Sequence, residues 1–127
     1  MSSAPAESYF ARARAMSAEG HFEYAIDLFL DGLKEDPGNI EAHAALRETA
    51  LRRSAAGGKD LVMLQKVKLR KPGADAVEDL LNIEKLLAYD PNNLEWLAAA
   101  IRHADAAGLM ATKHWFFEVY SNTANAR

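Results

Sequence analysis

Histidine is the side chain of this sequence best suited to acid–base or metal chemistry, and it occurs four times. The four residues are His21, His43, His103 and His114. No two of them are four residues apart, none belongs to an H-E-x-x-H pattern, and the chain has no cysteine. The ligand spacing of a zinc site and the motifs of an activated nucleophile are therefore missing. We expect no catalytic residues, no metal and no cofactor, and hence a protein that is not an enzyme.

The sequence Gly57-Gly58-Lys59-Asp60 is similar to the end of a phosphate-binding loop. A Walker loop needs G-x-x-x-x-G-K-[ST] after a strand, because its backbone N–H groups surround the phosphates and its hydroxyl binds magnesium. Here Asp60 stands where the hydroxyl is needed, and no strand is expected before it. We interpret the two glycines as the end of a helix.

Positive charge is concentrated in one segment. Residues 47–71 contain eight Lys/Arg and two Asp/Glu, a net charge of +6. The rest of the chain has seven Lys/Arg and sixteen Asp/Glu, a net charge of −9. Clustered cations with apolar residues between them can bind nucleic-acid phosphates or anionic lipid headgroups, although this segment has no aromatic residues to stack on bases. A solvated loop that balances an acidic body would have the same composition. The candidate basic patch consists of Arg52, Arg53, Lys59, Lys66, Lys68, Arg70 and Lys71.

Composition favours a single helical domain. The chain has 127 residues, half of them hydrophobic, which is enough for one continuous core. Strong helix formers fill long tracts, and there are only four prolines. No apolar run approaches the ~20 residues that cross a bilayer, and no basic and apolar regions of a secretory signal are visible at the start. We therefore expect an all-α protein in the cytoplasm.

Apolar residues recur at three- and four-residue spacing in six segments bounded by helix-breaking residues. Gly20 and Gly108 each separate two closely spaced segments, which indicates antiparallel helix hairpins. Asp36-Pro37 and Asp90-Pro91 repeat the same stop at the end of a hairpin. The expected helices cover residues 5–18, 22–36, 40–55, 74–89, 94–107 and 110–126.

Residues 56–73 interrupt this alternation and form an insertion between the third and fourth expected helices. Within the insertion, Leu61, Leu64 and Val67 have the spacing of one helix side. We expect them to form a short helix that lays this apolar side on the rest of the protein.

The first hairpin, residues 6–39, also follows a repeat pattern. In the pattern W-x2-L-G-x2-Y followed by A-x3-F and a proline, Tyr9, Ala13 and Met16 stand in the tryptophan, glycine and tyrosine places. The second hairpin has Arg47 in the glycine place, and the third has Lys113 in place of the alanine. With these residues the chain resembles the tetratricopeptide repeat (TPR) family. The second-helix matches in the first hairpin are Ala25, Phe29 and Pro37.

The resemblance implies a right-handed superhelical solenoid of about three hairpins, residues 6–39, 40–93 with an insertion at about 56–73, and 94–127. In TPR proteins the first helices of successive repeats line a concave groove that binds peptides or protein segments. The resemblance therefore implies a non-catalytic scaffold or adaptor with a protein or peptide partner. Binding of nucleic acid or an anionic membrane through residues 47–71 is the alternative. The groove residues implied by the resemblance are Glu7, Phe10, Arg14, Ser17, Glu41, Ala44, Glu48, Leu51, Glu95, Ala98, Arg102 and Asp105.

The last expected helix has apolar residues on more than one side. Phe116 and Tyr120 share a side, Trp115 and Val119 lie about 100° away, and Phe117 lies on the other flank. Only one side can pack against the preceding helix, and exposed apolar area usually marks an interface. We expect the repeat array to continue beyond residue 127, with self-association of this chain through Trp115, Phe116, Val119 and Tyr120.

Overall fold

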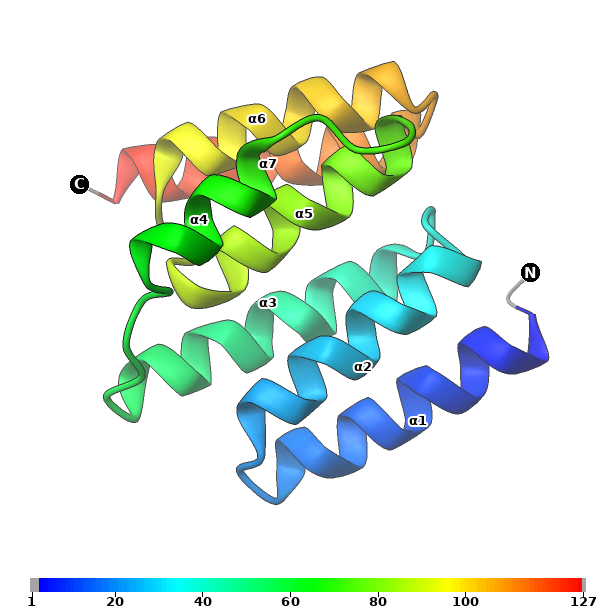
Figure 1. Ribbon diagram of the computed structural model, residues 1–127, viewed down its shortest axis with the longest axis vertical. Helices are drawn as coiled ribbons and strands as arrows, with labels where there is room; N and C mark the ends of the chain where they lie inside the picture. The colour runs from blue at the N-terminus through cyan, green and yellow to red at the C-terminus, as the bar shows by residue number, and fades with distance from the viewer. Residues whose placement is uncertain (1–2, 127) are drawn as a thin grey trace.

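The computed structural model describes residues 3–126, and within that range it contains seven helices and no strand (Figure 1). The expectation of an all-α fold is confirmed. Among the described helices, none has both the length and the apolar character needed to span a membrane. The helices are α1 (Ala4–Ala18), α2 (Phe22–Glu35), α3 (Ile40–Ala55), α4 (Met63–Arg70), α5 (Ala76–Tyr89), α6 (Leu94–Ala106) and α7 (Met110–Asn125).

Short-range signals explain where the helices begin and end. The side-chain oxygens of Asn39 and Asn93 accept hydrogen bonds from backbone N–H groups three residues later, at 3.0 and 3.1 Å, and so cap α3 and α6. Gly20 and Gly108 follow α1 and α6 with φ of 85° and 74°, a conformation that favours glycine. As a result, each expected boundary of the six predicted helices lies within two residues of the observed one.

The helices pack around two hydrophobic clusters. α1 lies against α2, and α3 lies beside α2 and α5. The first cluster lies between α1, α2, α3 and one side of α5, with Phe10, Phe29 and Leu46 fully buried. The second cluster joins α5, α6 and α7 and includes Leu97 and Phe116.

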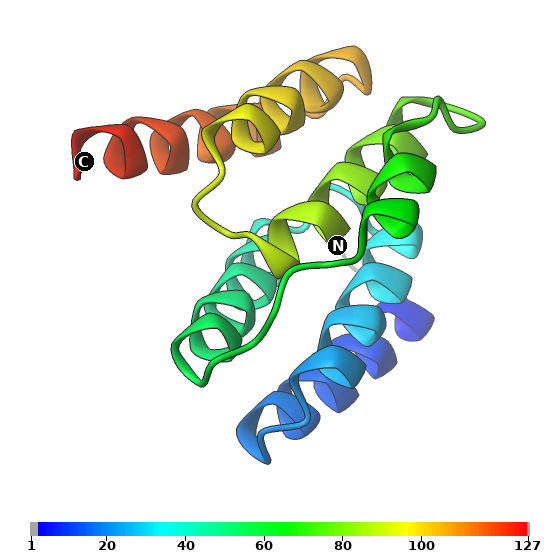
Figure 2. The same ribbon diagram turned by 60° about the vertical axis from the view of Figure 1, so that its left-hand side comes forward.

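The third hairpin differs from the expected stack. In a solenoid of equivalent hairpins, α6 would lie beside α3. Instead, α7 is the neighbour of α3, and no Cα atom of α6 lies within 8 Å of a Cα atom of α3. Figure 2 shows α6 and α7 side by side, with α5 between them and the pair that α1 and α2 form. The row of first helices that was expected to line a groove is therefore interrupted after α3.

The helix expected in the insertion is present as α4, but it packs through different residues. Leu61 and Leu69 are half-buried against the second cluster, whereas Leu64 and Val67 are 66% and 43% exposed. The helix begins at Met63, so Leu61 precedes it and Leu69 lies on its inner side. The expectation that Leu64 and Val67 face inward was wrong.

Candidate functional site

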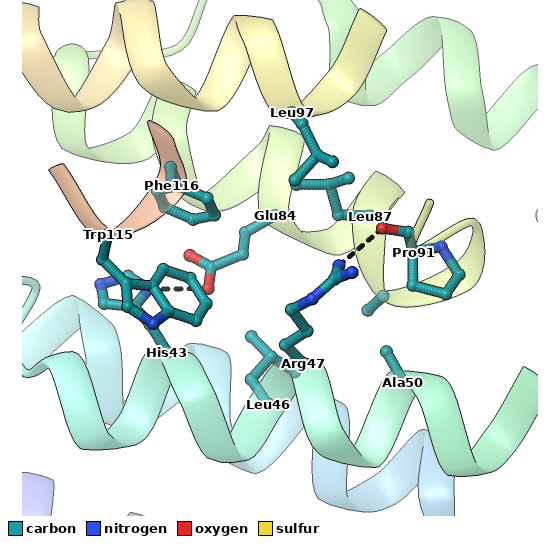
Figure 3. Close-up of a pocket in the computed structure, with 11 residues that line it drawn as sticks. His43, Leu46, Arg47, Ala50, Glu84, Leu87, Pro91, Leu97, Trp115 and Phe116 are labelled. Atoms are coloured by element: carbon teal, nitrogen blue, oxygen red, sulfur yellow. Dashed lines mark hydrogen bonds and ion pairs between the residues drawn. The ribbon is translucent and has the colours of Figure 1, made fainter. Parts of the chain in front are cut away.

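A buried ionic pair connects α3 with α5 (Figure 3). Nδ1 of His43 lies 2.7 Å from Oε2 of Glu84, and its Nε2 lies 2.7 Å from the backbone oxygen of Pro37. His43 is fully buried and Glu84 is 4% exposed. The Pro37 carbonyl can only accept, so Nε2–H donates to it and a proton on Nδ1 bonds Glu84. Burial lowers the pKa of His43, but the charge and hydrogen bond of Glu84, the Pro37 carbonyl and Asp36 outweigh it, so that pKa is raised.

Aromatic rings of α7 cover this pair. The centroids of the Trp115 and Phe116 rings lie 6.1 and 5.7 Å from that of His43. The two aromatic rings also contact each other edge-on, with centroids 4.9 Å apart. Figure 3 shows the Trp115 ring in front of His43 and of its contact with Glu84. The position of α7 beside α3 is thus fixed by ring packing on a buried histidine.

Arg47 forms a second connection at the same place. Its Nη1 donates to the Pro91 carbonyl at 2.6 Å and its Nη2 to the Asn92 side chain at 3.0 Å. A third contact of 3.5 Å reaches Thr123 in α7. Burial lowers the pKa of Arg47. This cation therefore ties α3 to the α5–α6 loop and to the end of α7.

A small cavity of about 20 Å³ lies among these groups. It has room for about one water molecule, whereas organic ligands occupy pockets of about 300–1,000 Å³. Oε1 of Glu84 is buried and has no hydrogen-bond partner within residues 3–126. A water molecule in the cavity would satisfy that atom. A His–Glu pair can transfer protons, but the space admits no substrate, so we interpret the site as a structural joint.

Little in the amino-acid sequence indicates this joint. His43 and Glu84 are 41 residues apart, and no spacing rule connects them. Arg47 was the one signal, because a long cation stands where the repeat pattern has glycine. No group of three or more His, Asp or Glu in the described residues is arranged to hold a metal ion.

The expected groove residues differ in exposure: most are exposed, two on α1 are buried and one on α6 is half-buried. On α3, the side with Glu41 and Leu51 is exposed, as expected. On α1, Phe10 is buried in the first cluster, which contradicts its expected place in the groove, and Ser17 is 6% exposed. They continue the buried stripe of Ala6 and Ala13, so that side of α1 packs inward. The exposed members are Glu7, Arg14, Glu41, Ala44, Glu48, Leu51, Glu95, Arg102 and Asp105, and Ala98 is half-buried.

Because α6 does not lie beside α3, the members on α6 do not join the others. Three expected groove residues do come together, at an open hollow of about 250 Å³ between α1 and α3. We call it the α1–α3 hollow. Arg14, Ser17 and Glu48 line it together with Ala18, Phe29, Ala45, Thr49 and Arg52.

Hydrogen bonds organise the floor of the α1–α3 hollow. Thr49 Oγ1 donates to the Ala45 carbonyl at 3.0 Å and lies 2.8 Å from Ser17 Oγ. Arg52 Nη1 donates to the same Ser17 Oγ at 3.1 Å, and its guanidinium lies 5.2 Å from the ring centroid of Phe22. Arg52 is thereby held in place. Thr49 and Arg52 were missed as members of the hollow, because the groove pattern selects one helix side only.

The candidate basic patch does not form one surface. Arg52 belongs to the α1–α3 hollow, and Arg53 is buried against Glu23, with Nε 2.6 Å from Oε2. Lys66 pairs with Asp60. The exposed cations around α4 are Lys59, Lys68, Arg70 and Lys71.

The residues expected to mediate self-association lie largely within the chain. Phe116 is 2% exposed and belongs to the second core cluster, so its expected place in an interface was wrong. Trp115, Val119 and Tyr120 are half-buried against the same cluster. The large apolar side chains of α7 that are exposed are Met110 and Phe117, at 51% and 56%.

Compared with protein-family models, with curated proteins and with solved structures, the chain shows no match.

Proposed function

We propose that this chain is a non-catalytic interaction scaffold, a TPR-like array of helix hairpins in the cytoplasm, that binds a protein or peptide segment. The α1–α3 hollow is the observation that carries the proposal. Arg14, Ser17 and Glu48 were selected from the groove pattern of the resemblance, and all three line this hollow. In this proposal the groove is confined to the first two hairpins, because α6 does not lie beside α3.

The hollow favours an acidic segment. Arg14 lines it from α1 and Arg52 from α3, and Arg14 has no hydrogen bond or ion pair within the described part of the chain. An aspartate or glutamate of a partner would form charge-assisted hydrogen bonds with both guanidinium groups. Glu48 can accept from the partner's backbone, and the small side chain of Ala45 leaves room for it.

Selection from a random peptide library tests this function. The immobilised wild-type chain should enrich peptides with an acidic residue, and titration should give their dissociation constants. Arg14→Glu should weaken binding by at least about tenfold, because a hydrogen bond between charged groups contributes about 1.5–3 kcal/mol. Arg12→Glu is the matched control, since Arg12 is exposed on α1 and outside the hollow, where it bonds the Tyr24 hydroxyl at 3.3 Å.

Selected peptides that bind Arg14→Glu and Arg12→Glu equally well would show that the hollow is not the binding surface. Failure to enrich any sequence would contradict the function itself.

A further inference from the structure

The helix α4 is attached to the rest of the protein by one side only. Half-buried Leu61 and Leu69 pack against the second core cluster. The guanidinium of Arg70 lies 5.2 Å from the ring centroid of Trp96 in α6. α4 packs on α5, and Figure 1 shows the two helices side by side. The opposite side of α4 therefore faces solvent.

This solvent side is apolar. Val62, Met63, Leu64 and Val67 are 65%, 70%, 66% and 43% exposed, and we call them the outer face of α4. They make up half of the eight large hydrophobic side chains exposed in residues 3–126. Single exposed apolar residues are ordinary, but such a concentration within six residues indicates an interaction surface.

Cations border the outer face of α4. At 100° per residue, Met63, Val67 and Leu64 lie within about 100° of the helix circumference. Lys68 follows about 40° beyond Leu64, and Arg70 lies about 20° beyond Met63 on the other flank. Residues 59–71 contain five Lys/Arg and one Asp, a net +4. The occupant of this surface must therefore combine negative charge with an apolar layer.

An anionic lipid bilayer has both properties. An interfacial helix buries its apolar side about 5–10 Å into the boundary between headgroups and acyl chains, while its lysines and arginines contact the headgroups. Nucleic acid offers phosphates but no apolar layer, and residues 59–71 contain no aromatic side chain for base stacking.

We propose that α4 docks this chain on an anionic lipid surface, with Met63, Leu64 and Val67 inserted and Lys68 and Lys71 among the headgroups. The proposal is independent of the α1–α3 hollow, because no residue of α4 lines that hollow. Arg14→Glu should leave lipid binding unchanged.

Vesicle flotation tests the docking. The probes are vesicles of phosphatidylcholine alone and vesicles with about 30 mol% phosphatidylserine, at about 0.1 M salt. Wild type should float with the anionic vesicles only. Met63→Gln with Leu64→Gln removes apolar groups without changing charge, and it should lower the partition coefficient at least about tenfold.

A charge variant and a control complete the set. Lys68→Glu with Lys71→Glu should also lower the partition coefficient at least about tenfold, because each cation near an anionic surface contributes about fivefold. Met110→Gln with Phe117→Gln removes exposed apolar side chains of α7 and should leave binding unchanged. All these positions are exposed, so circular dichroism should show the same helical content in every variant.

Three results would overturn the proposal. The first is equal binding to neutral and anionic vesicles, or to neither. The second is vesicle binding that survives Met63→Gln with Leu64→Gln. The third is that vesicles do not bind, while a single-stranded oligonucleotide, or a second copy of the chain detected by sedimentation, binds to the outer face of α4.

Discussion

Replacing Gly32 by alanine tests whether Phe10 is a core residue or a groove residue. Gly32 lies inside α2, where alanine is normally favoured over glycine by about 0.8–1.0 kcal/mol. A Cβ atom at this position would lie 2.4 Å from Cε1 and 2.6 Å from Cδ1 of the Phe10 ring. Carbon atoms in contact are normally about 3.5–4.0 Å apart, so the ring would have to shift by about 1 Å.

The magnitude follows from two opposing effects. Phe10 is fully buried and packs in the first cluster, so its ring has no free space to move into. Overpacking of this kind costs about 1–3 kcal/mol. After the helix-propensity gain is subtracted, Gly32→Ala should lower the free energy of unfolding by about 1 kcal/mol. In a Phe10→Ala background the clash is absent, so the same change should instead stabilise the fold by about 1 kcal/mol.

Urea denaturation of the four proteins of this double-mutant cycle measures the coupling between the two sites, expected to be about 2 kcal/mol. Gly38→Ala is the matched control, because a Cβ there would have its nearest neighbour at 3.8 Å. It should be close to neutral. If Gly32→Ala stabilises the wild-type protein, Phe10 does not lie under Gly32, and its expected place in the groove would be restored.

Three further predictions concern the joint, the first hairpin and α7. The pKa of His43 is raised in the fold, so the stability that its charged form contributes is complete below about pH 6.5 and is lost as the pH rises through the raised pKa. Thermal unfolding measured from about pH 6 to about pH 9 should therefore show a larger loss of stability for wild type than for Glu84→Gln. Ala25 is fully buried, so Ala25→Leu should lower the free energy of unfolding by about 1–3 kcal/mol, and an unchanged urea midpoint would contradict the packing of α1 on α2. Light scattering across concentration should show self-association through the exposed side of α7, and Phe117→Glu should prevent it; a strictly monomeric wild type would refute this interface.

The local features of the fold could be predicted from the sequence because they depend on nearby residues. Asn39 caps α3 through its own side chain, and Gly20 ends α1 through its own backbone conformation. The buried side of α3, with Leu46 and Ala50, follows from three- and four-residue spacing. Each of these signals operates within a few residues, which is why the expected helix boundaries were correct.

The arrangement of the third hairpin depends on contacts that no local pattern encodes. Both α6 and α7 have apolar residues on more than one side, so periodicity does not decide which helix meets α3. That choice is made by Trp115 and Phe116 packing on His43, which is more than seventy residues earlier in the chain. The assignment of Phe10 failed for a related reason: it is one of several apolar residues of α1, and its exposure depends on the missing side chain of Gly32.

The last turn of α3 explains why a run of basic residues is not a uniform patch. Arg52 faces the α1–α3 hollow, whereas the next residue, Arg53, points to the other side of the helix. Arg53 is buried, donates to the Lys59 carbonyl at 2.8 Å and lies 4.3 Å from the ring centroid of Tyr89 in α5. It therefore holds the start of the insertion against the body of the protein. Since α3 lines the hollow and anchors the insertion that carries α4, a bilayer bound by α4 would set the direction in which the hollow faces.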